Sequence, residues 1–205
     1  MRNGSSQQSG FVLVVTMVIL VAMMLLGIGL FRSVDTSTQV ANNLGFRQSA
    51  IASGDRGTET AFTWIQDNPG SLTADVPASG YYATEQIGTD FTGKLTTSTA
   101  DDVDWTGASG STRRAFPVTG TDAAGNKVAY IIQRMCDQTG AYIAGSTIQC
   151  ATSNANVSGG SSQGSPSYGS YAITGKAMLY YRITTRTEGV RNTVSYVQSQ
   201  VLVEY

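Results

Sequence analysis

An uncharged apolar run near the N-terminus constrains this chain more than any other feature. From Phe11 to Phe31 no side chain is charged, and only Thr16, Gly27 and Gly29 depart from Ala and the large apolar residues. At about 1.5 Å rise per residue, a helix of this length crosses the roughly 30 Å hydrocarbon core of a bilayer. A helix in the core of a soluble domain would carry a polar face, and this run has none. The run therefore predicts a membrane-spanning helix.

Two ordinary interpretations of the run are a signal peptide and a plain membrane anchor. A secretory signal peptide has an apolar region of about 7–15 residues followed by a small-residue cleavage site. This run is longer, and its small residues at the right spacing, Gly27-Ile28-Gly29, lie inside it. A plain anchor fits the run, although the charges of Arg2 and Arg32 on its two sides do not define its orientation.

The residues before the run point to a third interpretation. A short polar leader ends in Ser9-Gly10, and the apolar run begins with the aromatic Phe11. This junction resembles the prepilin peptidase site of type IV prepilins, where the enzyme cuts after the Gly and methylates the new N-terminus. The resemblance implies cleavage between Gly10 and Phe11 and N-methylation of Phe11. It also implies a cytoplasmic leader over residues 1–10 and a periplasmic location for everything after Phe31.

The chain departs from the major pilins at one position. Major pilins carry a Glu at the fifth position after the cleavage site, and here that position is Val15. A carboxylate in lipid needs a partner, which in pilins is the N-terminal amine of a neighbouring subunit. Val15 cannot form that pair. The chain resembles minor pilins and tip pseudopilins in this respect, which weighs against a major subunit.

Composition limits the function of the remaining chain. Of 205 residues only 13% are charged, and the net charge is −1. Because a nucleic-acid-binding protein needs a basic patch, we expect no nucleic-acid partner. The chain contains no His, which excludes Ser-His-Asp and Cys-His catalytic arrangements. We therefore expect no enzymatic activity and no cofactor.

The two cysteines, Cys136 and Cys150, lie on the side of the run that the anchor places outside the cytoplasm. An oxidising compartment favours a disulfide between them. A zinc site would need two further Cys or His ligands, which the chain does not contain. We expect a bridge and no metal at these residues.

The helical pattern continues beyond the membrane run. Residues 32–67 contain no Pro, and Ala61, Phe62, Trp64 and Ile65 make their C-terminal part the best candidate to pack on a sheet. Asn68-Pro69-Gly70 is expected to end the helix, because a residue before Pro avoids the α region. The glycines at 45, 54 and 57 weaken the case for a straight helical rod.

This stretch also carries a second resemblance, to PilX-type minor pilins. The matching residues are Arg32-Ser33, Ala41-Asn42-Asn43-Leu44, Arg47-Gln48 and Ala50, and in the tail Tyr181-Arg182-Ile183-Thr184, Asn192, Val194 and Val197-Gln198-Ser199. The resemblance therefore touches both ends of the chain and leaves roughly residues 69–126 uncovered. For the arginines, a solvated helix face is an equally good explanation.

The second half of the chain has the pattern of a sheet. Residues 127–136 alternate with both faces apolar, which indicates a central strand after a turn over 122–126. Residues 176–187 and 190–205 form a predicted hairpin around Glu188-Gly189. Shorter strand candidates cover residues 80–84, 94–97 and 115–119. The Ser/Gly/Asn-rich residues 151–170 indicate a mobile loop.

A loop-rich middle contains Asp101, Asp102 and Asp104 beside Trp105. Several carboxylates close together are a possible Ca²⁺ site, but their spacing is not that of an EF-hand and no bidentate Glu follows. A solvated acidic turn is the simpler explanation of these three residues.

These patterns together predict an α+β, pilin-like fold, with a long N-terminal helix packed on an antiparallel sheet. The expected parts are a leader (1–10), a transmembrane assembly helix (11–31), the periplasmic half of the helix (32–68) and a β-rich headpiece (69–205). The expected function is that of a minor pilin in a priming or tip complex, first in the inner membrane and then on the pilus. Its expected partners are the prepilin peptidase and other pilins. A type II secretion pseudopilin and an anchored or tip adhesin are the alternatives.

Overall fold

The structure is a computed structural model that describes residues 9–108, 110, 112–143, 147–153 and 178–204. Most of the predicted leader and most of the predicted mobile loop lie outside the described residues. The chain forms two compact units, Met1–Gly45 and Phe46–Tyr205. Helix α1 (Ser9–Asp67) contributes to both, so the prediction of one continuous helix is confirmed. It ends before Pro69, where Asn68 Nδ2 donates a hydrogen bond to the carbonyl of Trp64.

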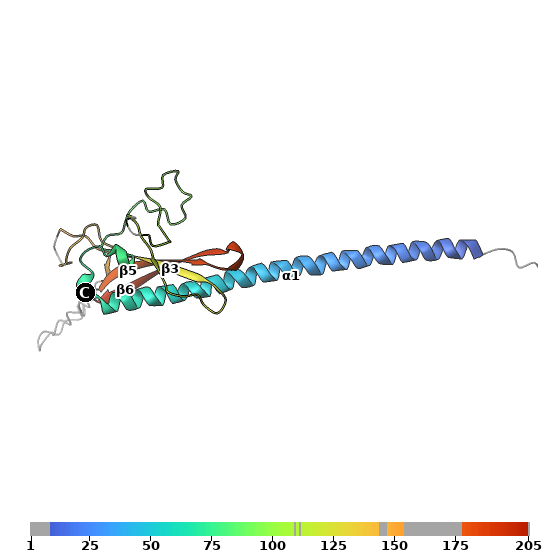
Figure 1. Ribbon diagram of the computed structural model, residues 1–205, viewed down its shortest axis with the longest axis horizontal. Helices are drawn as coiled ribbons and strands as arrows, with labels where there is room; N and C mark the ends of the chain where they lie inside the picture. The colour runs from blue at the N-terminus through green and yellow to red at the C-terminus, as the bar shows by residue number, and fades with distance from the viewer. Residues whose placement is uncertain (1–8, 109, 111, 144–146, 154–177, 205) are drawn as a thin grey trace, which may run out of the picture. The chain divides into compact units, whose positions relative to one another are not determined.

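The second unit contains a six-stranded sheet (Figure 1). Its strands are β1 (Tyr81–Tyr82), β2 (Phe116–Pro117), β3 (Lys127–Arg134), β4 (Thr152–Ser153), β5 (Met178–Glu188) and β6 (Val194–Glu204). The described residues also form short 3-10 helices over Pro69–Ser71, Pro77–Ser79 and Val190–Asn192. Strand β3 pairs with β5 on one side and with β1 and β2 on the other, so the predicted central strand is confirmed. Strand β6 pairs with β5.

The predicted α+β architecture is confirmed, with one difference in the sheet. Four of the five pairings are antiparallel, but β1 runs parallel to β3, with Tyr81 beside Ile132. The sheet is therefore mixed. Strands β1 and β2 both pair with the same edge of β3, β1 in parallel and β2 in antiparallel direction. Each is only two residues long, so the two pairings can differ in direction.

The C-terminal part of α1 packs on one face of this sheet. Ala61 and Ile65 are fully buried against Tyr130, Ile132 and Ile183, as the sequence predicted for this part of the helix. The neighbouring Trp64 ring lies 5.2 Å from the ring of Tyr81. This face carries the larger of the two buried apolar clusters of the described residues. Apolar burial of this kind contributes roughly 25 cal/mol per Å².

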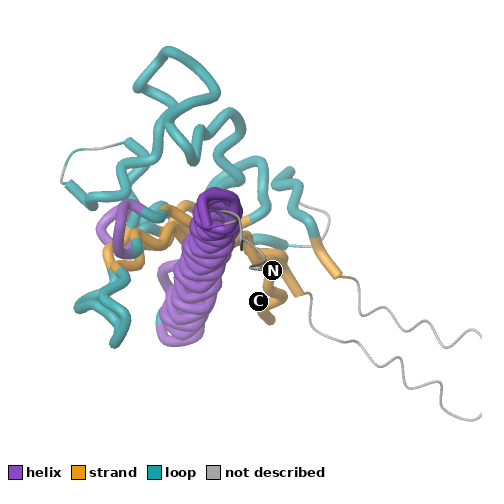
Figure 2. Tube along the Cα trace, turned by 90° about the vertical axis from the view of Figure 1, so that its right-hand side faces the viewer, coloured by secondary structure: helices purple, strands orange, loops and turns teal. Residues whose placement is uncertain are grey.

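Loops cover part of the other face of the sheet (Figure 2). Ala129 and Ile131 point to this side and form a second buried cluster with Tyr82, Val103 and Ala115. Phe91 and Trp105, from the loop-rich middle of the chain, pack against this cluster. The unit thus has three layers, with the sheet between a helix and ordered loops.

The short strand predictions were only partly correct. The candidates at 80–84 and 115–119 contain β1 and β2, but each strand is shorter than predicted. The candidate at 94–97 is wrong, because this segment curls around two carboxylates. The Leu95 N–H donates to Asp90 and the Thr96 hydroxyl donates to Asp101, which fixes a turn instead of a strand.

The tail hairpin is confirmed, with a longer connection than expected. Strand β5 extends to Glu188, and β6 begins only at Val194. The Gly189 N–H donates to the carbonyl of Thr193, which closes the connection. Arg191 and Asn192 take positive φ values of 58° and 57° inside it.

The glycines of α1 differ in what surrounds them. A Cβ atom at Gly57 would lie 2.5 Å from Cγ1 of Val128 and 3.0 Å from Cγ2 of Thr185, whereas a Cβ at Gly45 would meet no atom within 4 Å. Gly57 therefore permits the close approach of helix and sheet, which explains why a residue unfavourable to helices stands there.

We expect Gly57→Ala to lower the free energy of unfolding by about 1 kcal/mol, because the steric cost of overpacking exceeds the gain in helix propensity. The matched control Gly45→Ala is expected to leave stability unchanged or raise it by up to about 1 kcal/mol. Denaturant unfolding of the full chain in detergent, followed by tryptophan fluorescence, measures both. Equal stability of the two variants would contradict this explanation of Gly57.

Candidate functional site

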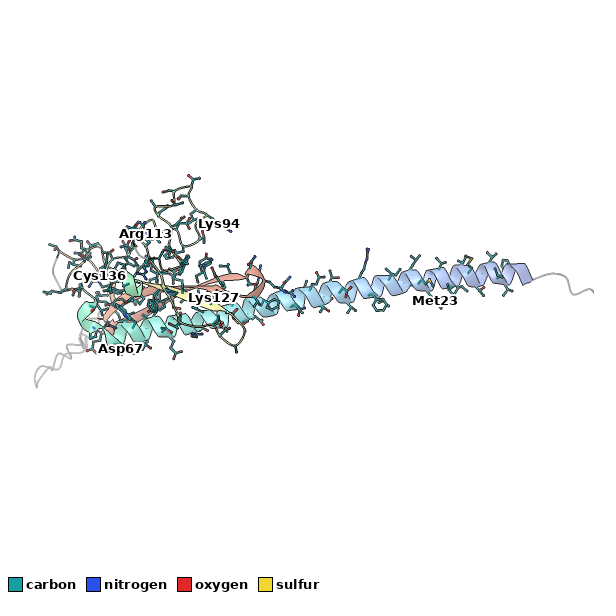
Figure 3. All side chains as sticks on the ribbon, viewed as in Figure 1. Met23, Asp67, Lys94, Arg113, Lys127 and Cys136 are labelled. Carbon is teal, nitrogen blue, oxygen red and sulfur yellow. A yellow bond between two sulfur atoms is a disulfide. The ribbon has the colours of Figure 1, made fainter. Side chains whose placement is uncertain are left out.

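The first functional candidate is the apolar part of α1. Over Phe11–Phe31 the large apolar side chains are exposed, from 38% for Val15 to 76% for Phe31. None of the most apolar stretch of this helix is buried. Figure 3 shows side chains projecting both above and below the helix around Met23. The helix is long and apolar enough to cross a membrane.

The small residues in this part of the helix make no contacts that require them to be small. A Cβ atom at Gly10, Gly27 or Gly29 would meet no atom within 4 Å. Packing within the described part of the chain therefore does not account for these glycines. In a membrane helix, small residues permit close approach of a neighbouring helix.

The residues of the predicted cleavage site lie at the start of α1. Gly10 and Phe11 follow the first residue of the helix, Ser9, and both are exposed, Phe11 to 75%. Val15 lies about one turn further along the helix and supplies no carboxylate or other polar group. The structure thus places all three residues on the surface of one exposed helix.

The residues that carry the second resemblance lie further along the same helix and in the tail hairpin. Arg32-Ser33 and the segment Ala41–Leu44 are exposed, and so are Arg47 and Gln48. In the hairpin, Ile183 is buried while Gln198 is exposed. Ala50, the last matching residue of the helix, is fully buried. The matching residues therefore do not form one cluster, and the exposed ones on the helix fit a solvated face as well as a contact surface.

The second functional candidate is the loop closed by the disulfide. The structure joins Cys136 to Cys150, as predicted. Three hydrogen bonds join this loop to residues outside it. The buried Arg134 donates to the carbonyls of Gly140 and Gln138, and the Gly140 N–H donates to the carbonyl of Thr73. The loop presents Ile143 with 67% of its surface exposed.

The acidic residues of the middle segment form a braced turn. The Asp104 carboxylate accepts hydrogen bonds from the Thr106 N–H and hydroxyl and from the Ala108 N–H. Asp101 accepts one from the Thr96 hydroxyl. Within the described ranges, no group of three or more His, Cys, Asp or Glu side chains is arranged to hold a metal ion.

Sequence reasoning missed two other carboxylates that organise loops. Asp90 is 1% exposed. Burial raises its pKa, but hydrogen bonds from the N–H groups of Leu95, Thr92 and Gly93 outweigh this effect and lower the pKa to about 2. The short pattern of an Asp followed by Thr-Gly two residues later is a turn signal that would have indicated it.

Asp122 is the second such carboxylate. It accepts hydrogen bonds from the hydroxyl of Ser53 on α1 and from the N–H groups of Asn126 and Ala124. The hydroxyl of Ser53 has the largest effect, and together these donors lower the pKa of Asp122 to about 2. Asn126 also donates to Ser49 and Ser53, so this network fastens the turn before β3 to the helix.

Comparison with known proteins gave no relative of this chain. A scan against protein-family models, a search of curated proteins and a search of solved structures each found no match.

Proposed function

We propose that this chain is a minor pilin of a type IV pilus, active in a priming or tip complex. The observation that carries the proposal is the exposed apolar run of α1, which starts at Phe11 directly after Gly10, in a helix that continues to Asp67 and packs there on a sheet. An anchor alone would need the apolar helix, but it would not need the polar leader with Ser9-Gly10-Phe11.

In this proposal the segment Phe11–Phe31 spans the inner membrane before assembly, and the sheet-containing domain lies in the periplasm. After the prepilin peptidase cuts behind Gly10, Phe11–Phe31 leaves the lipid and packs against the same segments of other pilins. Both environments are apolar, so the transfer costs little hydrophobic free energy, and van der Waals packing drives it. Gly27 and Gly29 support this step because no contact in the described chain needs them to be small.

Val15 supports a place outside the shaft. A shaft subunit is expected to pair a buried Glu with the N-terminus of its neighbour, and Val15 has no charge to offer. A subunit at the tip has neighbours on one side only, so the absence of that pair is tolerated there.

The mature N-terminus tests the proposal. We expect that co-expression with a prepilin peptidase yields a chain beginning at Phe11, with the mass of one added methyl group, by intact mass and peptide mapping. Gly10→Leu should abolish this cleavage, whereas Gly4→Leu, a matched change within the leader, should not. A wild-type chain that keeps residues 1–10, or a Gly10→Leu chain that is cleaved normally, would overturn the proposal and leave a plain membrane anchor.

Two other functions share part of this evidence. A pseudopilin of a type II secretion system would be processed by the same peptidase, so deletion of the gene decides: loss of piliation with secretion intact favours the pilus. A tip adhesin is favoured by the disulfide loop, which presents the exposed Ile143 on a braced segment. Loss of adhesion with normal piliation, in a variant without the disulfide, would favour the adhesin.

A further inference from the structure

Within the part of the chain that the structure describes, strand β6 is a long edge strand of the sheet. It runs over 11 residues from Val194 to Glu204, and among the described residues its only strand partner is β5. Its pairing with β5 is continuous, without a bulge, and the strand contains no Pro. Glu204, at its end, is its only charged residue. Edge strands of natural proteins are normally protected by charges, bulges or Pro, because a bare edge pairs with other strands.

The contacts of β5 identify which groups of β6 point outward. The N–H of Tyr180 donates to the carbonyl of Ala151, and its own carbonyl accepts from the N–H of Met135. The backbone of Tyr180 therefore faces away from β6. Its register partner, Leu202, must then turn its N–H and carbonyl away from β5, because the two residues of an antiparallel pair either bond to each other or both point outward.

The same orientation recurs at every second residue. The outward set is Val194, Tyr196, Gln198, Gln200, Leu202 and Glu204. In agreement, the carbonyl of Val197, which is not in this set, accepts a hydrogen bond from the hydroxyl of Thr185 on β5. A further strand placed beside β6 could therefore form a regular ladder of backbone hydrogen bonds with these N–H and carbonyl groups.

A shallow, open apolar groove accompanies this edge on the helix side of the sheet. It has a volume of about 290 Å³ and lies between Val201 of β6 and Phe62 and Thr58 of α1. Asp55 and Glu59 form its rim, and both are exposed. No ion pair joins either carboxylate to a described residue. The groove therefore offers apolar contact beside two uncompensated negative charges.

We propose that β6 binds an extended segment of another protein, which adds to the sheet as a further strand. Backbone pairing supplies the main affinity, and side chains on the helix side determine which segment fits. Because side chains of a strand alternate, every second residue of the partner faces the groove. The fitting segment carries apolar side chains for the groove and Lys or Arg at neighbouring positions opposite Asp55 and Glu59.

A second copy of this chain fits the edge less well. Its β6 contains no Lys or Arg to face Asp55 and Glu59, and each copy would bring its own two carboxylates to the contact. The inference goes beyond the proposed function and does not depend on the N-terminal helix.

The test uses the full chain in detergent and a fluorescent capped peptide, Thr-Val-Thr-Lys-Thr-Lys-Thr-Val-Thr, which reads the same in both directions. We expect saturable binding by fluorescence anisotropy and slowed amide hydrogen exchange at the outward residues of β6. A peptide with Glu in place of Lys should bind more weakly. In the protein, Asp55→Asn with Glu59→Gln should weaken binding of the Lys peptide by about threefold, as expected for two exposed ion pairs.

The decisive variants are at Gln200, whose N–H points outward. Gln200→Pro removes that donor without removing a bond to β5, since Pro is tolerated where the N–H of an edge strand faces solvent. We expect it to weaken peptide binding by about tenfold relative to Gln200→Thr, which keeps the donor. Equal tryptophan fluorescence of the two variants establishes that both are folded.

Three results would overturn the proposal: no binding of the Lys peptide to the wild-type chain, equal binding of the Lys and Glu peptides, or equal binding by the two Gln200 variants. Sedimentation gives a fourth. Dimers that form in the wild type and are lost in Gln200→Pro would mean that a second copy occupies the edge. None of these results depends on cleavage at Gly10, so they are distinct from failure of the proposed function.

Discussion

Replacing Arg134 by Met is expected to lower the free energy of unfolding by about 4 kcal/mol. The side chain is fully buried, and its guanidinium donates to the carbonyls of Ala83 at 3.0 Å, Gly140 at 2.9 Å and Gln138 at 3.1 Å. Met fills much of the same volume but donates nothing, so three carbonyls lose their partner. A buried acceptor left without a partner costs about 1–3 kcal/mol, and two of these three are less buried.

Denaturant unfolding of the full chain in detergent measures this loss. Tryptophan fluorescence is a suitable signal, because both tryptophans, Trp64 and Trp105, lie in the unit Phe46–Tyr205. Arg47→Met is the matched control, since Arg47 is exposed, and it should change stability by less than about 0.5 kcal/mol. A loss below about 1 kcal/mol for Arg134→Met would mean that water or rearranged loops satisfy these carbonyls.

Removing the disulfide is expected to cost about 3 kcal/mol. The bond between Cys136 and Cys150 closes a loop of about 15 residues, and in the chain-entropy model this restricts the unfolded chain by that amount. The measurement compares the wild type with the double variant Cys136→Ser, Cys150→Ser by denaturant unfolding without reductant. Wild type treated with reductant serves as control and should match the double variant. Equal stability of oxidised and reduced wild type would contradict the prediction.

The disulfide and Arg134 hold the same loop, so their effects should not add. Loss of either one loosens the segment between the cysteines in the folded state. The second change then removes fewer stabilising contacts, so it lowers the free energy of unfolding by less. We expect the variant lacking both to lose clearly less than the sum of the separate losses. Strict additivity would mean that the two stabilise different parts of the unit.

Local patterns were enough for the elements with strong periodicity. The apolar run, the Pro-free continuation and Asn68-Pro69 predicted α1 to within two residues, because these signals act on neighbouring backbone atoms. Alternation predicted β3 and the tail hairpin in the same way. The pairing of Cys136 with Cys150 followed from their number and from the oxidising compartment that the predicted anchor implies.

Elements held by contacts between distant residues were not predictable in this way. Strands β1 and β2 have two residues each, too few for a period, and the parallel direction of β1 depends on where the chain meets β3. The turn over 94–97 is a different case, because the four groups that donate to Asp90 lie within five residues of it, and the local Asp-x-Thr-Gly pattern would have indicated it.

The sequence by itself determined the apolar helix, the Gly10-Phe11 junction and the absence of a carboxylate at Val15, because each depends only on residue type and order along the chain. Only the tertiary structure decided which glycines of α1 meet the sheet, which loop Arg134 holds and which edge of the sheet has no further strand partner among the described residues. These depend on distances between residues far apart in the sequence, and no local pattern encodes those distances.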